Sequence, residues 1–240
     1  MPLVSLEEAV APLVSILPEV QHYASVAKQQ CKTVPADGLT RDESASIILY
    51  TMDWKPHEEC VYVVLNATLR DRDRQKLIPW FLYLNLIHTA LAQLPSRHNF
   101  VYRGVKGNLS EKYRRGREIV WWGFSSCTSN LGVFENAPYF DKTSERTLFT
   151  IDCDSGKDIS QHTYFPSEEE ILLLPARQFV VIACLKSASD LTMIQLKEIS
   201  SPIPLLQPVT VASKSSKPSS GKRKIISLFE VINSKNMRIS

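Results

Sequence analysis

The chain has 240 residues, of which 44% are hydrophobic and 22% are charged, as in a folded globular protein with a core of its own. A formal charge of +3 is too small a bias to indicate nucleic-acid binding. No window holds about eighteen consecutive apolar residues, so we expect no membrane span. The N-terminal residues lack the basic-then-apolar order of a secretory signal, which favours a cytoplasmic location.

The first part of the chain has helical signals. We expect a helical lead-in over 1–35, and the Thr40 and Glu43 pair matches a capping box that opens the next helix. Residues 66–76 are charged and expected to be helical. The strongest helix is predicted over 78–94, where apolar residues recur at spacings of three and four. His88 on this helix is expected to be a packed core residue.

Short β-prone segments follow, separated by Gly, Pro, Asp or Ser. They are expected at 100–102, 119–124, 147–151, 170–174, 179–185 and 192–198. Helices first and strands afterwards is the order of an α+β fold, not of a doubly wound sheet.

Residues 201–240 differ in composition from the rest. Four prolines and a Ser/Lys run over 201–224 predict a linker, and its basic residues have no acidic neighbour. The basic residues are Lys214, Lys217, Lys222, Arg223 and Lys224. A solvated tail is the simplest interpretation, and a nuclear-import signal or a contact with an acidic surface is the alternative.

The five cysteines are odd in number and widely spaced, which is typical of reduced thiols. No CxxC pair or nearby histidine gives a zinc signature. Cys127 stands out because it lies inside one of three segments that place polar groups beside β-prone runs.

The first of these segments is Tyr102-Arg103-Gly104, where an arginine at a strand end could hold a phosphate or carboxylate. The second runs from Trp121 to Ser129, where hydroxyls after a strand could position a charged neighbour by hydrogen bonding. A strand followed by a Ser/Thr turn is the simpler interpretation. No G-x-S-x-G elbow is present to indicate a serine nucleophile.

The third segment places three acids before an apolar strand. Because side chains alternate along a strand, we expect Glu168 and Glu170 to point to the same side and Glu169 to point away. Two carboxylates on one side can raise a pKa or divide an acid–base task. A solvated turn before a buried strand is the structural alternative.

In this order, the three segments resemble the arginine–serine–glutamate class of mono-ADP-ribosyltransferases, of the arginine-specific, eukaryotic-like type. The resemblance covers residues 40–185. It implies an α+β ADP-ribosyltransferase fold, with N-terminal helices followed by two packed, mainly antiparallel sheets that form an NAD cleft. The expected organisation is a lead-in over 1–39, a catalytic domain over 40–200, and a linker and tail over 201–240.

The resemblance also implies roles for individual residues. Arg103 and Gly104 match the arginine segment that holds the NAD phosphate. Ser126 matches the serine that orients the catalytic glutamate and touches the nicotinamide ribose, and Thr128 takes the place of the second serine. Phe165 matches an aromatic residue that meets the protein substrate. Glu168 matches an acid that is typical of enzymes that modify arginine.

Glu170 matches the catalytic glutamate. Cys127 replaces the usual threonine of the serine motif. Because Ser125 and Ser129 also carry hydroxyls, the motif could be aligned to this sequence one residue earlier or later. The glutamate triplet also permits Glu169 as the catalytic acid. The alternation of side chains argues against this, because Glu169 would point away from Glu168.

The implied activity is transfer of ADP-ribose from NAD to an exposed arginine of a protein acceptor, with release of nicotinamide. Cleavage of the nicotinamide–ribose bond passes through an oxocarbenium-like sugar, which a carboxylate can stabilise. Nicotinamide is a good leaving group, so no metal is expected. The alternatives are an NAD glycohydrolase on the same fold and a non-catalytic NAD-binding module.

Overall fold

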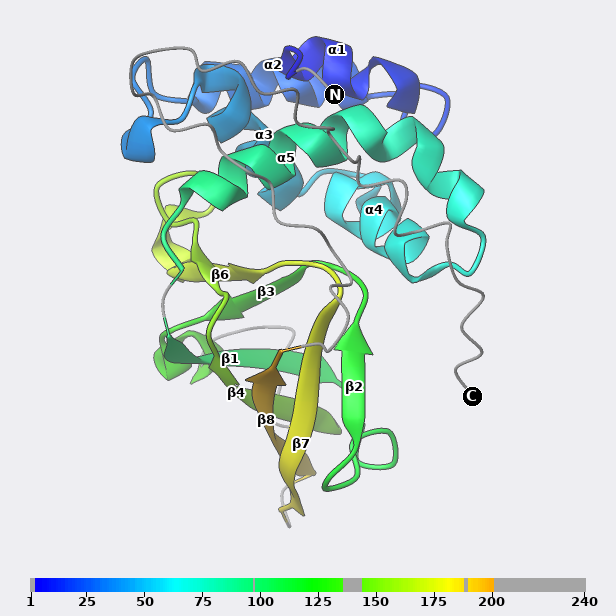
Figure 1. The fold of residues 1–240 in the computed structure, drawn as a ribbon, viewed down its shortest axis with the longest axis vertical. Coiled ribbons are helices and arrows are strands. Elements are labelled where there is room, and N and C mark those ends of the chain that lie inside the picture. Colours follow the sequence, from blue (N-terminus) through cyan, green and yellow to red (C-terminus); the bar gives the residue numbers. More distant parts are fainter. Residues whose placement is uncertain (1–2, 97, 136–143, 188–189, 201–240) are drawn as a thin grey trace, which may run out of the picture.

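The computed structural model describes residues 3–96, 98–135, 144–187 and 190–200, and in this part of the chain helices precede strands (Figure 1). The α+β order predicted from the sequence is therefore confirmed. The predicted linker and tail over 201–240 lie outside the described residues. None of the helices in the described ranges has the length and apolar character needed to cross a membrane.

The described residues contain five α-helices, which form a layer over one end of the sheet (Figure 1). They are α1 (Leu6–Val10), α2 (Val20–Gln30), α3 (Arg41–Thr51), α4 (Val61–Arg70) and α5 (Phe81–Gln93). Short 3-10 segments lie between several of them, at Ala11–Leu13, Ala36–Gly38, His57–Glu59 and Arg74–Trp80.

Helix α3 begins at the capping box that the sequence predicts. The Thr40 hydroxyl accepts a hydrogen bond of 3.2 Å from the Glu43 N–H, and the Glu43 carboxylate accepts one of 2.8 Å from the Thr40 N–H. Both contacts satisfy N–H groups that the helix cannot bond internally. From Glu43 to Thr51 every residue of α3 is buried, so this helix lies at the centre of the helical layer.

Helix α5 begins three residues later than predicted. The segment Arg74–Trp80 is a 3-10 helix that contains Pro79, and the α-helix starts at Phe81. His88 on α5 is buried against the ring of Phe124, and its burial lowers the pKa of the imidazole to about 4. The prediction that His88 is a packed core residue is confirmed.

The helices of the N-terminal lead-in share the core of the rest of the helical layer. Leu6 and Val10 of α1 and Val20 of α2 belong to the same apolar cluster as Leu49 of α3 and Ile87 of α5. Asp42 also accepts a hydrogen bond of 2.8 Å from the Leu6 N–H. Residues 6–31 are therefore an integral part of the helical layer.

Eight strands follow these helices in the part of the chain that the structure describes. They are β1 (Asn99–Lys106), β2 (Glu118–Trp121), β3 (Ser125–Thr128), β4 (Arg146–Cys153), β5 (Lys157–Asp158), β6 (Glu170–Leu173), β7 (Arg177–Lys186) and β8 (Leu191–Ile199). The six β-prone segments predicted from the sequence each overlap one of these strands, whereas β3 and β5 were not predicted.

The strands form one mixed sheet in the order β2-β7-β8-β4-β1-β3-β6-β5, so the expectation of two packed sheets is wrong. Its pairs are antiparallel except for β4 and β8, which run parallel. The sheet stays continuous because β1 pairs with β4 along its whole length and also with β3 at Tyr102 and Thr128.

The short β3–β6–β5 end of this sheet lies beneath the helices (Figure 1). Side chains alternate along β6, so Leu172 joins the apolar cluster of the helices while Leu173 joins a second cluster inside the curved sheet. The functional segments therefore lie where the helical layer and the sheet meet.

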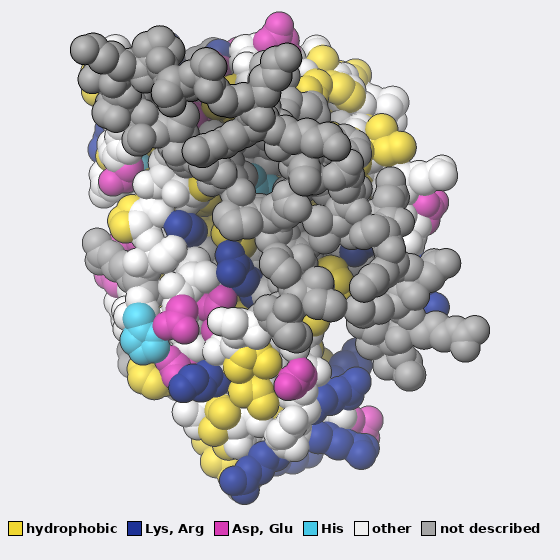
Figure 2. Space-filling model, viewed as in Figure 1, with side chains coloured by type: hydrophobic (Ala, Val, Ile, Leu, Met, Phe, Trp, Pro, Cys, Tyr) yellow, Lys and Arg dark blue, Asp and Glu magenta, His cyan; other side chains and the backbone are white. Residues whose placement is uncertain are grey.

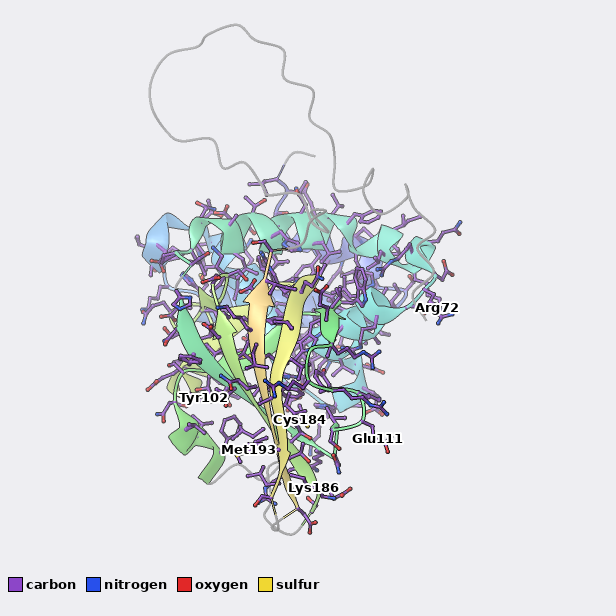
Figure 3. All side chains as sticks on the ribbon, turned by 60° about the horizontal axis from the view of Figure 1, so that its bottom comes forward. Arg72, Tyr102, Glu111, Cys184, Lys186 and Met193 are labelled. Atoms are coloured by element: carbon purple, nitrogen blue, oxygen red, sulfur yellow. The ribbon has the colours of Figure 1, made fainter. Side chains whose placement is uncertain are left out.

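The part of the sheet formed by β1, β4 and β8 has an open face. Tyr102 of β1 and Met193 of β8 lie on it, on the side opposite the buried residues Val101 and Ile194 (Figure 3). Lys and Arg side chains gather at the lower end of the molecule in Figure 2, near the loop before β2 and the end of β7 in Figure 1. The exposed basic residues there are Lys112, Arg114, Arg115, Arg117 and Lys186.

Candidate functional site

Arg103 lies in the middle of β1, opposite Phe149 of β4. Its Nη1 donates a hydrogen bond of 2.6 Å to the backbone carbonyl of Ser126 on β3. This bond fixes the guanidinium beside the hydroxyl-rich strand, across the narrow junction between β1 and β3. Gly104, the next residue of β1, pairs with Leu148 and is partly exposed.

The hydroxyl-rich segment is itself a strand, so the predicted Ser/Thr turn is wrong. Ser125–Thr128 form β3, which pairs with β6 through Ser126 and Leu172 and through Thr128 and Glu170. The sequence gives little sign of a strand here because Ser and Cys are not strong strand formers. Pairing with an apolar neighbour strand overrides that local preference.

Cys127 points to the other side of β3 from Ser126 and Thr128. Its side chain joins the cluster inside the sheet with Ile151 and Leu173. Burial raises the pKa of the thiol to about 12, so it stays protonated at neutral pH. A redox role would require an exposed, partly ionised thiol, and Cys127 meets neither condition.

Glu170, the first residue of β6, is only 6% exposed. Burial raises the pKa of its carboxyl, hydrogen bonds from Ser126 and Thr163 oppose that shift, and the positive charge of Arg103 opposes it further. The Thr163 hydroxyl lies 3.0 Å from Oε2 of Glu170. The structure thus brings Arg103, Ser126 and Glu170 together, as the sequence analysis expects.

The strand-alternation argument for the glutamate triplet is wrong, because only Glu170 belongs to the strand. Glu168 ends a 3-10 helix over Pro166–Glu168, and Glu169 adopts a left-handed conformation with φ 47°. The turn sends Glu169 toward Ser129, whose hydroxyl donates to its carboxylate at 3.3 Å. Glu168 nevertheless raises the pKa of Glu170, so these two carboxylates are electrostatic neighbours.

Thr128 and Phe165 flank the glutamates. The Thr128 hydroxyl donates to the backbone carbonyl of Glu168 at 3.1 Å and so ties the end of β3 to the glutamate turn. Phe165 is 37% exposed and packs edge-on against Tyr164. Glu168 is exposed as well, and partial burial raises the pKa of its carboxyl. Phe165 and Glu168 thus form the outer edge of the site.

The loop before β6 is anchored on α3. Ser44 and His162 share a buried hydrogen bond of 2.9 Å, and the Tyr164 N–H donates to the Thr51 hydroxyl at 2.8 Å. A cavity of about 160 Å³ lies between this loop and the helices. Its walls are formed by Gln30, Lys32, Pro35, Ser44, Ile48, Gln161, Thr163, Tyr164 and Pro166. The cavity adjoins Glu170 through Thr163.

Sequence reasoning missed Thr163 and Tyr50. Tyr50 of α3 is buried beside Phe124, and its hydroxyl accepts a hydrogen bond of 3.0 Å from Asn66. The charges of Glu170 and Arg103 both act on this phenol, which places it next to the site. Neither residue belongs to a motif, so only the fold could identify them, through the hydrogen bond of Thr163 to Glu170 and the electrostatic influence of Glu170 on Tyr50.

The arrangement combines a buried carboxylate with hydroxyl donors and a fixed guanidinium. A carboxylate held in this way can stabilise positive charge that develops on a sugar, because its hydrogen bonds are in place before the reaction. The guanidinium has five N–H donors and suits a phosphate. The second carboxylate, at the exposed edge, suits a cationic acceptor.

The model of the family described as NAD:arginine ADP-ribosyltransferase matches residues 15–202. The rabbit (Oryctolagus cuniculus) GPI-linked NAD(P)(+)–arginine ADP-ribosyltransferase 1 is 27% identical over 176 residues, which are 69% of this chain and 50% of that protein. A chicken (Gallus gallus) NAD(P)(+)–arginine ADP-ribosyltransferase 1 is 32% identical over 93 residues, or 39% of this chain and 28% of that protein. This chain spans half or less of the length of the curated relatives it matches.

Solved structures share the fold. The eukaryotic mono-ADP-ribosyltransferase ART2.2 superposes with a TM-score of 0.53 at 18% identity, covering 82% of this chain and 85% of that chain. The ADP-ribosyltransferase Vis, a toxin from Vibrio splendidus, was solved in complex with agmatine and gives a TM-score of 0.52 at 20% identity. That likeness covers 84% of this chain and 89% of that chain.

Proposed function

Because the chain belongs to the NAD:arginine ADP-ribosyltransferase family, we propose that it transfers ADP-ribose from NAD to the guanidinium of an arginine on an acceptor protein. The products are the ADP-ribosylated acceptor and nicotinamide. The observation that carries this proposal is the meeting of Arg103, Ser126 and Glu170 at the junction of β1, β3 and β6.

In the proposed reaction the bond between nicotinamide and the ribose breaks, and its electron pair leaves with nicotinamide. Positive charge then develops on the ribose, and the ionised Glu170 stabilises it through the neighbouring ribose hydroxyl. Ser126 and Thr163 hold the Glu170 carboxylate in one orientation. Arg103 holds a phosphate of NAD.

The acceptor nitrogen needs a different environment. A guanidinium has a pKa above 12 and is a poor nucleophile while protonated. Glu168, at the exposed edge of the site, binds the acceptor guanidinium and takes up its proton as the bond to ribose forms. Phe165, also exposed, offers a surface for the acceptor protein. Gly104 and Thr128 complete the binding site for NAD.

The test mixes the purified chain with NAD labelled in the adenylate part and with agmatine as a minimal acceptor. Transfer of the label to agmatine supports the proposal. If nicotinamide release is the same with and without agmatine, the chain hydrolyses NAD and does not transfer ADP-ribose to arginine. NAD binding by calorimetry without any release would show a non-catalytic module.

Mass spectrometry of a cell lysate incubated with the chain and NAD would then identify the acceptor. Modified arginines on a small set of proteins support the proposal. Modification confined to other side chains would contradict the arginine specificity assigned to Glu168.

A further inference from the structure

A cluster of three side chains with metal-binding atoms lies in the connection between α3 and α4, apart from the residues of the candidate site. It consists of Asp53, His57 and Cys60, whose ligand atoms all lie within 4.8 Å of one another. His57 begins a short 3-10 helix, and Cys60 immediately precedes α4. We call this the 53–60 cluster.

The distances within the cluster are close to those around a tetrahedral ion. Nδ1 of His57 lies 2.9 Å from Oδ1 of Asp53, and Sγ of Cys60 lies 3.2 Å from the same oxygen. With bonds of about 2.0 to 2.3 Å, a tetrahedral zinc ion separates its ligand atoms by about 3.3 to 3.8 Å. Shifts of a few tenths of an ångström would bring these two pairs to that spacing, and the third pair, Nδ1 of His57 and Sγ of Cys60, lies within 4.8 Å.

We propose that the 53–60 cluster binds a divalent transition ion of the zinc class through one oxygen, one nitrogen and one sulfur. This mixed ligand set is one that Zn²⁺ accepts, whereas Mg²⁺ and Ca²⁺ prefer oxygen ligands alone. Binding converts the Cys60 thiol to a metal-bound thiolate and releases its proton to solvent. Three protein ligands leave the fourth position to water.

One backbone contact of Cys60 suits a metal-bound thiolate, whereas burial raises the pKa of the free thiol to about 11. The backbone N–H of Trp54 donates to Sγ at 3.2 Å, which is the kind of outer contact that orients a metal-bound sulfur. The Trp54 ring stacks on Tyr23 of α2 with centroids 4.1 Å apart, so the segment that carries Asp53 is held in place. The cluster is therefore largely preorganised before an ion arrives.

An ion can also reach the cluster. The side chains of Asp53 and His57 are 50% and 63% exposed, whereas Cys60 is buried beneath them. The Tyr62 hydroxyl lies 3.4 Å from Oδ1 of Asp53 and 3.3 Å from Nδ1 of His57, so a polar group borders two of the three ligand atoms. An ion here would join the end of α3 to the start of α4.

The sequence lacks the usual zinc signature of paired cysteines. The spacing Asp53-x3-His57-x2-Cys60 is not such a signature, so the site is inconspicuous in the sequence. A single cysteine is combined with a histidine and an aspartate in one short connection. Only the turn at His57–Glu59 brings the three ligand atoms together.

The test uses the full chain, stripped of metal with a chelator and titrated with Co²⁺. Co²⁺ in a tetrahedral site with a thiolate gives visible bands and a near-ultraviolet charge-transfer band, which Zn²⁺ should abolish by displacement. We expect one equivalent to bind, and the melting temperature to rise with added Zn²⁺ because the ion binds the folded state.

Asp53→Asn and His57→Ala carry the test, because both side chains are exposed and should be replaceable without loss of the fold. Each should weaken Co²⁺ binding by about tenfold or more, since losing even an outer partner of a metal site typically costs about 10- to 100-fold. His22→Ala and Cys184→Ser are matched controls outside the cluster and should bind as the parent chain does.

Three results would overturn the proposal: no saturable Co²⁺ binding by the parent chain, binding that Asp53→Asn and His57→Ala leave unchanged, or binding without the thiolate band. In each case the contacts among Asp53, His57 and Cys60 would be a hydrogen-bond network at the start of α4. None of these readouts depends on the activity proposed above.

Discussion

The Thr163 hydroxyl donates a hydrogen bond of 3.0 Å to the carboxylate of Glu170, and both residues are buried. Thr163 comes from the loop before β6, and its neighbours His162 and Tyr164 are hydrogen-bonded to α3. The orientation of the Glu170 carboxylate therefore depends on how this loop is fixed to the helical layer. Thr163 acts as a positioning residue for Glu170.

Replacing Thr163 with valine tests this relationship, because valine keeps the shape and removes the hydroxyl. A buried hydrogen bond to a charged group contributes about 1.5 to 3 kcal/mol, so we expect kcat to fall by about tenfold to a hundredfold. KM for NAD should change less, since Thr163 is assigned no contact with NAD. Steady-state kinetics of nicotinamide release with agmatine would measure both.

The pH dependence separates positioning from a general loss of structure. The proposed reaction needs Glu170 ionised, and the Thr163 bond lowers the pKa of that carboxyl. Removing the bond raises the pKa, so activity should be lost at a higher pH as the solution is acidified. Thr163→Ser restores the hydroxyl and should restore the profile. An unchanged acid limb in Thr163→Val would contradict the role assigned here.

The sequence pointed to residues that the fold brings together, but it did not predict their local structure. Glu170 starts a strand as expected, but Glu168 and Glu169 precede it in a turn that requires a left-handed residue. A run of three glutamates has no glycine or asparagine to signal such a turn. The contact of the Thr128 hydroxyl with the Glu168 carbonyl holds it, and that contact depends on the fold.

Glu168→Gln should separate transfer to arginine from cleavage of NAD. Without its charge this side chain cannot take up a proton from the acceptor guanidinium, whereas Glu170 still stabilises the sugar. We expect transfer to agmatine to fall by about 100-fold or more, and nicotinamide release to water to change much less. Parallel assays of labelled agmatine and of free nicotinamide would show this split.

Glu169→Gln is the matched control for Glu168→Gln, because Glu169 is the adjacent acid and faces Ser129. It should keep both transfer and hydrolysis near the level of the parent chain. If Glu169→Gln lost transfer and Glu168→Gln kept it, the register of the glutamate triplet would have to be shifted by one residue.

Glu170→Gln should abolish activity and stabilise the fold. The loss of a carboxylate that acts only in the transition state costs about 100- to 1,000-fold in rate. Burial raises the pKa of Glu170 above its ordinary 4.5, so ionising it at neutral pH costs folding free energy. Glutamine removes that cost and can still accept the Thr163 bond, so the melting temperature should rise at pH 7.

The stabilisation by Glu170→Gln should shrink as the pH falls. Once the solution is acid enough to protonate Glu170 in the parent chain, both chains carry a neutral side chain at this position and their melting temperatures should converge. A variant that is destabilised at pH 7, or equally stabilised at every pH, would show that ionisation of Glu170 is not the cause.

The helices were predictable because their signals are local. The capping box of Thr40 and Glu43 and the apolar face of α5 operate within a few residues of the chain. The continuity of the sheet was not predictable, because it depends on Tyr102 pairing with Thr128 while the rest of β1 pairs with β4. Such long-range pairing leaves no periodic trace in a single sequence.

Cys127 should resist alkylation in the folded chain although it lies inside the serine motif. Its thiol is buried, and burial raises its pKa to about 12, so neither access nor the reactive thiolate is available at neutral pH. Cys184 is the partly exposed cysteine of the described residues and should react first.

Iodoacetamide labelling followed by peptide mass spectrometry would rank the five thiols by their reactivity. Nicotinamide release should be unchanged when Cys184 alone is modified. Labelling of Cys127 in the native chain, with loss of that activity, would contradict the burial of this thiol.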